Sequence, residues 1–170
     1  MFGLTDPTAQ ERVVAAYPGY PDARAAVDLG GDLTFWHPSI EIAQAHSRHA
    51  PTYSYRFDYA PPLLRWTGFH ATHAFELLAV FGQADTALGR VVTAAGGRRA
   101  LRTVSDAVQR QWLHFAHVGE PLPSWPRYDE HDRATVVFDD PTHVEYDPWR
   151  ERRLAWAGYR GYRGVALPQR

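Results

Sequence analysis

The chain has 170 residues, enough for one ordinary domain with a sizeable core. Its 18 basic and 19 acidic side chains nearly cancel, which argues against nucleic acid or an anionic membrane surface as its main partner. The sequence contains neither lysine nor cysteine, so lysine Schiff bases, thiolate catalysis, disulfides and cysteine-bound zinc are excluded.

Three helices are predicted before the first strand. The first covers residues 6–17, with Asp6 as its N-cap and a proline in its first turn. The second covers residues 22–31 and ends at a pair of glycines, and the third covers residues 32–49. Pro38 lies inside the third helix and is expected to start a new turn or to kink it.

The middle of the chain predicts a strand and two further helices. Aromatic residues at every second position of residues 52–59 are typical of a strand. A loop rich in proline and glycine follows, and then an apolar stretch at 73–81 predicts a short helix that ends at Gly82. The clearest helix lies between Arg99 and Gly119, because its apolar residues fall three and four apart on one stripe. These residues are Leu101, Val104, Val108, Trp112 and Phe115.

The C-terminal part predicts a hairpin and a last helix. Two short strands at 135–138 and 143–146 are followed by a helix over 148–156 and a loose tail over 158–170. One strand and one hairpin cannot satisfy their own hydrogen-bonding edges. Residues 1–170 therefore predict a single but partial domain, whose sheet is completed by strands from elsewhere.

Six of the nine histidines occur in pairs spaced three residues apart. The pairs are His46/His49, His70/His73 and His114/His117. This spacing could place two metal ligands on one side of a helix. However, no acidic residue stands between the paired histidines as a zinc protease requires, and His114 and His117 lie away from the apolar stripe of their helix. We therefore predict no metal and no cofactor.

His73 differs from the other histidines in its surroundings. It stands at the junction between a glycine-containing loop and an apolar helix. Such a junction can hold a general base firmly and present it to a cleft. From this position alone, a purely structural histidine remains the favoured interpretation.

A resemblance to a known family changes that balance. Residues 73–82, His-Ala-Phe-Glu-Leu-Leu-Ala-Val-Phe-Gly, resemble the catalytic-histidine motif of type-B carboxylesterases, the cholinesterase-like branch of the α/β-hydrolases. That motif reads roughly His-Gly-x-Glu-Leu-x-x-Val-Phe-Gly, and Ala74 stands where it has glycine. Four further segments, in the family's order, extend the resemblance to roughly residues 22–156. They are Asp32-x-x-Phe35-x-x-Pro38, Tyr53 to Phe57, Trp112-x-x-Phe115-Ala116-x-x-Gly119-x-Pro121, and Trp125-Pro126-x-Tyr128.

The resemblance implies an α/β fold, the C-terminal portion of an α/β-hydrolase, with a late sheet strand, packed helices and a terminal β-hairpin. It implies that His73 is the triad histidine, which takes the proton of a nucleophilic serine and returns it to the leaving alcohol. Glu76 would be a structural hydrogen-bonding residue in the helix that follows. Trp66 and Phe69, near the histidine loop, would either line the substrate pocket or be ordinary core residues.

The other parts of the family's machinery are missing from this sequence. It contains no Gly-x-Ser-x-Gly motif and no glycine-rich oxyanion motif. In the family, the triad acid precedes the histidine by more residues than this chain has before His73. The chain is therefore predicted to be inactive alone and incomplete as a fold. To act on a small-molecule carboxylic ester it would need the missing N-terminal esterase portion, in the same or a separate chain.

A second hypothesis is a non-catalytic remnant. Such a chain could act as an interaction module that pairs its exposed sheet edge with a second copy, as a homo-oligomer. No signal peptide or membrane-spanning segment is visible in the sequence. If Met1 is the true start, we expect the chain to be cytoplasmic.

Overall fold

The computed structural model describes residues 7–159, which fall into two compact units. One unit contains the residues up to Ala45 together with those from Pro148 onward, and the other contains His46–Asp147. Asp6, the expected cap of the first helix, and residues 160–170 of the expected tail lie outside the described residues. The expectation of one single domain stays a prediction, and each unit is described by itself.

The described residues of the first unit form helices and the turns between them, without a strand. It contains α1 (Pro7–Ala15), α2 (Ala23–Gly31), a π-helical turn (Asp32–Trp36), α3 (His37–Ser47) and α8 (Arg150–Trp156). All four predicted helical segments are present within two or three residues of their expected ends. The α3 helix ends two residues inside the neighbouring unit.

The glycine pair does not end the second helix, contrary to our prediction. Gly31, Asp32 and His37 all have right-handed helical backbone angles, so the chain runs helically from Ala23 to Ser47. Glycine lowers helix stability by only about 1 kcal/mol, which burial of the residues around it can offset. The change of turn expected at Pro38 is present as the π-helical turn just before it, where the His37 N–H bonds to the Asp32 carbonyl.

The core of the first unit surrounds an acidic side chain. Trp156 is fully buried among Val13, Tyr17 and Leu29. The Tyr17 hydroxyl donates to the Asp32 carboxylate at 2.6 Å and accepts a hydrogen bond from the Trp156 indole N–H at 2.7 Å. These contacts join residues that lie up to 139 positions apart in the sequence.

The second unit contains a three-stranded sheet in the order β1-β2-β3. β1 (Ser54–Phe57) pairs in parallel with β2 (Ala134–Phe138), which pairs antiparallel with β3 (His143–Tyr146). The predicted hairpin is confirmed. The sequence did not predict which strand pairs with β1, and the structure shows that its parallel partner is β2. Within residues 7–159, β1 remains an edge strand on its other side.

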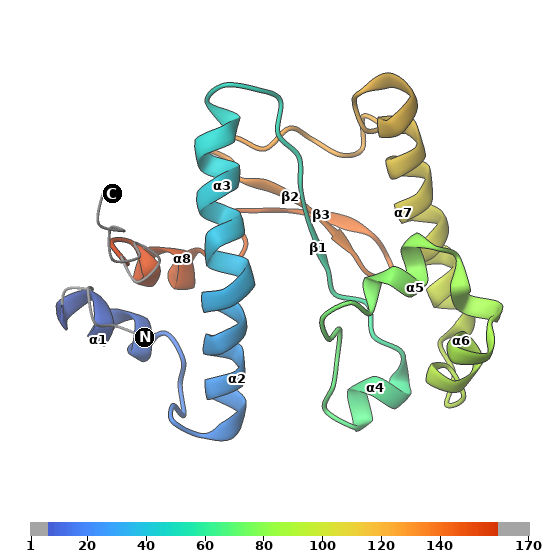
Figure 1. The fold of residues 1–170 in the computed structure, drawn as a ribbon, viewed down its shortest axis with the longest axis horizontal. Helices are drawn as coiled ribbons and strands as arrows, with labels where there is room; N and C mark the ends of the chain where they lie inside the picture. The colour runs from blue at the N-terminus through green and yellow to red at the C-terminus, as the bar shows by residue number, and fades with distance from the viewer. Residues whose placement is uncertain (1–6, 160–170) are drawn as a thin grey trace, which may run out of the picture. The chain divides into compact units, whose positions relative to one another are not determined.

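Five helical segments cover this unit, of which the sequence predicted only two. The predicted pair are α5 (Glu76–Val80) and α7 (Arg98–Val118), and Gly119 ends α7 with a φ of 80° as expected. No helix of the described part of the chain has the length and apolar character that crossing a bilayer requires. The segments are α4 (Pro62–Trp66), α5 (Glu76–Val80), a 3₁₀ turn (Gln83–Asp85), α6 (Ala87–Val92) and α7 (Arg98–Val118). α5 lies against α7, and α6 lies against the 3₁₀ turn that also contacts α7 (Figure 1).

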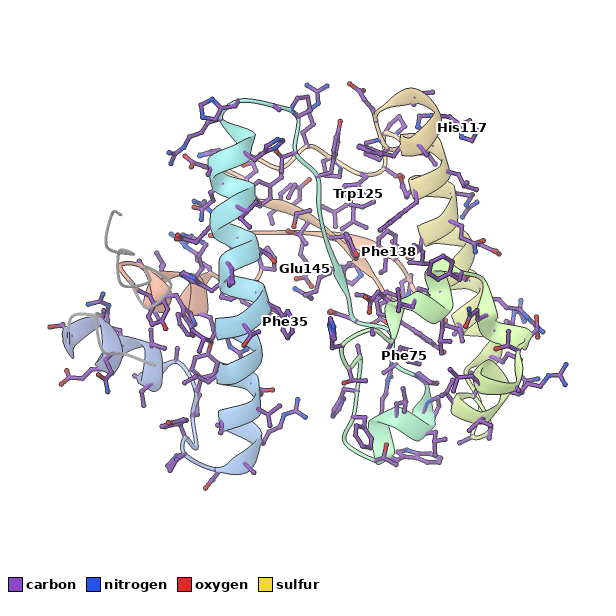
Figure 2. The ribbon with its side chains drawn as sticks, in the orientation of Figure 1. Phe35, Phe75, His117, Trp125, Phe138 and Glu145 are labelled. Carbon is purple, nitrogen blue, oxygen red and sulfur yellow. The ribbon has the colours of Figure 1, made fainter. Side chains whose placement is uncertain are left out.

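The core of the second unit lies between the sheet and α7. Phe75, Trp125 and Phe138 lie on the side of the strands that faces this helix (Figure 2). The first part of the α7 stripe, Leu101 to Val108, is buried as predicted. The second part is not, because Trp112 is 44% exposed and Phe115 is 49% exposed.

Candidate active site

His73 lies in the loop between α4 and α5, whose backbone is tightly turned. Gly68, His70 and Ala74 have positive φ angles of 79°, 50° and 68°. Ala74 stands where the motif has glycine, and its backbone explains that preference. A side chain in the left-handed region costs about 1–2 kcal/mol that glycine does not incur. The loop therefore keeps the conformation of a glycine position although alanine occupies it.

The residues after His73 fix this loop to the core. Phe75 is buried and forms an edge-to-face contact with Phe57 on β1, with ring centroids 6.2 Å apart. At the other end of α5, the Ala79 carbonyl accepts a hydrogen bond from the Ser105 hydroxyl at 2.5 Å. Gln109 donates similarly to the carbonyl of the next residue at 3.0 Å. These two bonds from α7 hold the C-terminal end of α5, and buried Phe75 holds its N-terminal end. The backbone that carries His73, just before α5, is therefore fixed.

His73 is exposed and lies on the wall of an apolar cavity of about 610 Å³, which we call the histidine hollow. Serine and carboxylate side chains are absent from the described residues that line it. The hollow can therefore accommodate an apolar group beside an imidazole, but the lining supplies neither a serine nor a carboxylate. Its larger side chains are Leu64, Phe69, Leu77, Phe81 and Leu88.

The other predicted site residues are placed differently from one another. Phe69 lines the histidine hollow, whereas Trp66 does not and is 77% exposed on α4. Glu76 is the half-buried first residue of α5. Burial, and after it the charge of Glu76, raises the pKa of Tyr55. Within residues 7–159 the Glu76 side chain makes no hydrogen bond that would support its expected role, so the roles of these three residues stay predictions.

All five serines lie in the described residues, and none stands on a turn from a strand into a helix, where a nucleophile elbow is found. Ser39 and Ser105 donate to backbone carbonyls, at 2.7 and 2.5 Å. Ser124 accepts from the Gln111 amide at 2.8 Å, and Ser54 lies in β1. Since none of them stands on such an elbow, we expect a serine nucleophile for His73 to come from outside residues 7–159.

The paired histidines do not assemble into a metal centre in the described part of the chain, where no group of three or more potential ligands comes together. His46 is hydrogen-bonded to Thr52 at 2.9 Å through its Nδ1. His114 and His117 use the same ring atom towards the Glu120 and Leu113 carbonyls, both at 2.7 Å. Each ring therefore has a local structural contact.

Sequence reasoning missed most of the wall of the histidine hollow. Phe81 lies inside the recognised motif, but nothing in the pattern indicated that it faces this cavity. Leu88 comes from α6, a helix that was not predicted. Thr86 caps α6 by accepting a hydrogen bond from the Gly89 N–H at 3.2 Å. That threonine, placed just before a short apolar run, is the signal that could have revealed the helix.

The chain is similar to known proteins over most of its length. Residues 21–155 match the family described as "Carboxylesterase family". The chain is 34% identical over 146 residues to the para-nitrobenzyl esterase of Bacillus subtilis, covering 84% of this chain and 29% of that protein. It is 32% identical over 112 residues to mouse liver carboxylesterase 1, covering 61% of this chain and 19% of that protein.

The chain is also similar to solved structures of esterases. A structure titled PNB esterase aligns with a TM-score of 0.69 at 31% identity, covering 87% of this chain and 30% of the other. A Geobacillus stearothermophilus carboxylesterase aligns with a TM-score of 0.70 at 30% identity, covering 91% of this chain and 32% of the other. The chain thus spans less than a third of the length of each of these relatives.

Proposed function

The chain belongs to the carboxylesterase family, and from this membership we propose that it is the C-terminal segment of a carboxylic ester hydrolase, with His73 as the histidine of the catalytic triad. The fold class predicted from the sequence is confirmed, since the neighbouring structures are esterases of the α/β-hydrolase class and the described residues form a small mixed sheet with packed helices. The substrate we propose is a small-molecule carboxylic ester.

The observation that carries this proposal is the position of His73. Its loop is anchored by buried Phe75 and by the two hydrogen bonds from α7, so the imidazole is presented from a fixed backbone. A general base needs this combination of a rigid support and access to the reacting atoms. The apolar wall of the histidine hollow gives the acyl or alcohol part of an ester a surface to bind beside the ring.

In the proposed reaction His73 first accepts a proton and then donates it. It takes the proton from a serine hydroxyl as that oxygen attacks the ester carbonyl, and it then gives the proton to the leaving alkoxide. A second cycle with water releases the acid and regenerates the serine. The serine, the carboxylate that orients the imidazole and the backbone N–H groups that stabilise the oxyanion come from the rest of the esterase. We keep Phe69 and Trp66 as proposed pocket residues and Glu76 as a proposed structural residue.

The test uses the native gene product, isolated from its source cells with an antibody raised against this chain. A fluorophosphonate probe reports a serine activated by its histidine, and p-nitrophenyl acetate reports turnover. We expect His73→Gln, introduced into the gene, to abolish labelling and to lower turnover by at least about 10³-fold. The purified 170-residue chain should neither be labelled nor turn over the ester above the rate of its own His73→Gln variant.

His117→Gln is the matched control, because His117 is another exposed histidine, near the C-terminal end of α7 (Figure 2). It should leave labelling and turnover unchanged. Native product that still labels and hydrolyses normally with His73→Gln would show that another residue is the base. Turnover by the purified chain that depends on His73 would show that a complete site exists within this sequence.

A further inference from the structure

The segment that carries His73 is attached at both of its ends to α7. It begins at Tyr59, shortly after β1, and reaches Ala79 in α5, and both of these residues are buried. Residues 65–70 and 72–74 between them are exposed. The firm attachments of the segment therefore lie at its ends, and α5 packs directly against α7 (Figure 1).

Tyr59 fixes the first end at the start of α7. Its hydroxyl donates to the carbonyl of Gly97, the N-cap residue of α7, at 2.5 Å. Gly97 has a φ of 87°, and a Cβ at this position would lie 2.8 Å from the hydroxyl oxygen and 3.0 Å from Pro62. A side chain here would be strained and would push Tyr59 away. Glycine therefore lets the tyrosine approach the backbone closely enough to bond to it.

Ser105 and Gln109, one turn apart on α7, hold the second end. The Ser105 hydroxyl, on a residue that is 4% exposed, donates to the Ala79 carbonyl at 2.5 Å, which also accepts the Gly82 N–H at 3.1 Å. The Gln109 amide donates to the Val80 carbonyl at 3.0 Å. The last carbonyls of a helix have no partner within it, so these two side chains join the C-terminal end of α5 to α7.

The part of α7 between these attachment points is firmly packed. Leu101, Val104 and Val108 are no more than 2% exposed and belong to the same core cluster as Val136 and Phe138 of β2. Close-packed interiors have low compressibility and transmit displacements. α7 is therefore a rigid support, and the three side-chain bonds transfer its position to the loop before α5.

Taking the proposed function as given, we propose that Tyr59 and Ser105 are positioning residues, whose hydroxyls hold His73 where it can reach the proton of the serine. Neither residue lines the histidine hollow, so each acts through the backbone and not on the substrate. Removing either hydroxyl takes away a bond between the segment and α7, and the imidazole then occupies a wider range of positions. A misplacement of about 1 Å is enough to lower a rate by about 10²-fold.

The test measures turnover per active serine in the native gene product that carries Tyr59→Phe or Ser105→Ala. Each substitution deletes one oxygen and leaves the rest of the side chain in place. Labelling to completion with the fluorophosphonate probe counts the competent sites, and the turnover of p-nitrophenyl acetate is divided by that count. We expect kcat per site to fall by about tenfold in each variant. KM should stay within about twofold, because an interaction that acts only in the transition state lowers kcat and kcat/KM equally.

Thr103→Ala is the matched control, because the exposed Thr103 hydroxyl also belongs to α7 but bonds to the Arg99 carbonyl of its own helix at 3.2 Å. It should leave turnover per site unchanged. If Tyr59→Phe and Ser105→Ala lower only the number of labelled sites, the hydroxyls stabilise the fold alone and the proposal is overturned. A raised KM with an unchanged kcat overturns it as well, because the hydroxyls would then act on substrate binding.

The His73→Gln variant separates this proposal from the catalytic one. Labelling that survives His73→Gln overturns the catalytic role of the histidine, whatever the two hydroxyl variants do. If His73→Gln abolishes labelling while Tyr59→Phe and Ser105→Ala keep full turnover per site, only the positioning proposal fails.

Discussion

The core of residues 46–147 and the core of the helical unit differ in the kind of side chain that each buries. The first packs aliphatic and aromatic side chains from β1, β2, α5 and α7, with Phe138 fully buried between the rings of Tyr55 and Trp125 at 5.6 Å each. The second wraps a few apolar residues around a hydrogen-bonded chain of polar atoms.

The polar chain of the helical unit has a clear electrostatic consequence. Burial raises the pKa of Asp32, although hydrogen bonds from Tyr17 and from Arg152, at 2.6 and 3.1 Å, act in the opposite direction. Burial and the contact with Asp32 also raise the pKa of Tyr17. A buried carboxylate is tolerated only while these partners are in place. One core is therefore stabilised by area removed from water, and the other depends on a few specific contacts.

The largest expected effect comes from breaking the apolar core. Phe138→Ala removes a ring that is 0% exposed and should lower the free energy of unfolding by about 3–5 kcal/mol. Chemical denaturation followed by tryptophan fluorescence measures the loss. Phe81→Ala, at an exposed ring, is the control and should change stability by less than about 0.5 kcal/mol. Equal effects of the two variants would mean that the sheet and α7 do not form the core described here.

A smaller effect is expected from the polar core. Tyr17→Phe deletes one oxygen that bonds both the Asp32 carboxylate and the Trp156 indole. Because both partners stay buried, we expect a loss of about 2 kcal/mol, measured in the same denaturation experiment. Tyr146→Phe, at an exposed tyrosine in β3, should cost less than about 0.5 kcal/mol. A Tyr17→Phe variant as stable as the parent would show that packing alone holds the helical unit.

These two cores also explain what could be predicted from the sequence. The α7 stripe, the strand pattern around Tyr55 and the hairpin were all readable, because burial of apolar residues leaves a period of 3.6 or 2 in the chain. The bond between Tyr17 and Trp156 was not readable, since it joins residues 139 positions apart and leaves no period. For the same reason the parallel pairing of β1 with β2 was missed.

The candidate site, like the cores, could be predicted from the sequence only in part. His73 could be found because it belongs to a contiguous motif, whereas Leu64 and Leu88 of the histidine hollow come from separate short helices. The sequence could not show the exposure of Trp112 and Phe115 either, because a stripe predicts an apolar face but not which part of it is covered. The sequence therefore indicates the catalytic histidine better than it indicates which residues line the cavity around it.

The smallest expected effect concerns an ion-pair network on the sheet of residues 46–147. Arg56 on β1 donates to Asp58 at 2.6 Å and to Glu145 on β3 at 2.9 Å, and the His143 ring lies 3.3 Å from Glu145. Hydrogen bonds to the Pro141 carbonyl and to Glu145 raise the pKa of His143. Hydrogen bonds from Arg56 lower the pKa of Glu145.

The direction of the pH dependence follows from these two shifts. The folded protein holds the His143 proton more tightly than the unfolded chain, so this contribution is full below about pH 6.5 and is lost as the pH rises through the raised pKa. The Glu145 contribution is present above about pH 4.3 and is lost as the pH falls through the lowered pKa. His143→Gln should therefore remove a decline of stability on the alkaline side of pH 6.5, of no more than about 0.5 kcal/mol because both side chains are partly exposed. His131→Gln, at a side chain that is 95% exposed, should keep that decline. If His143→Gln keeps it too, the ring contributes nothing to this core, and the sheet is held by its apolar face alone.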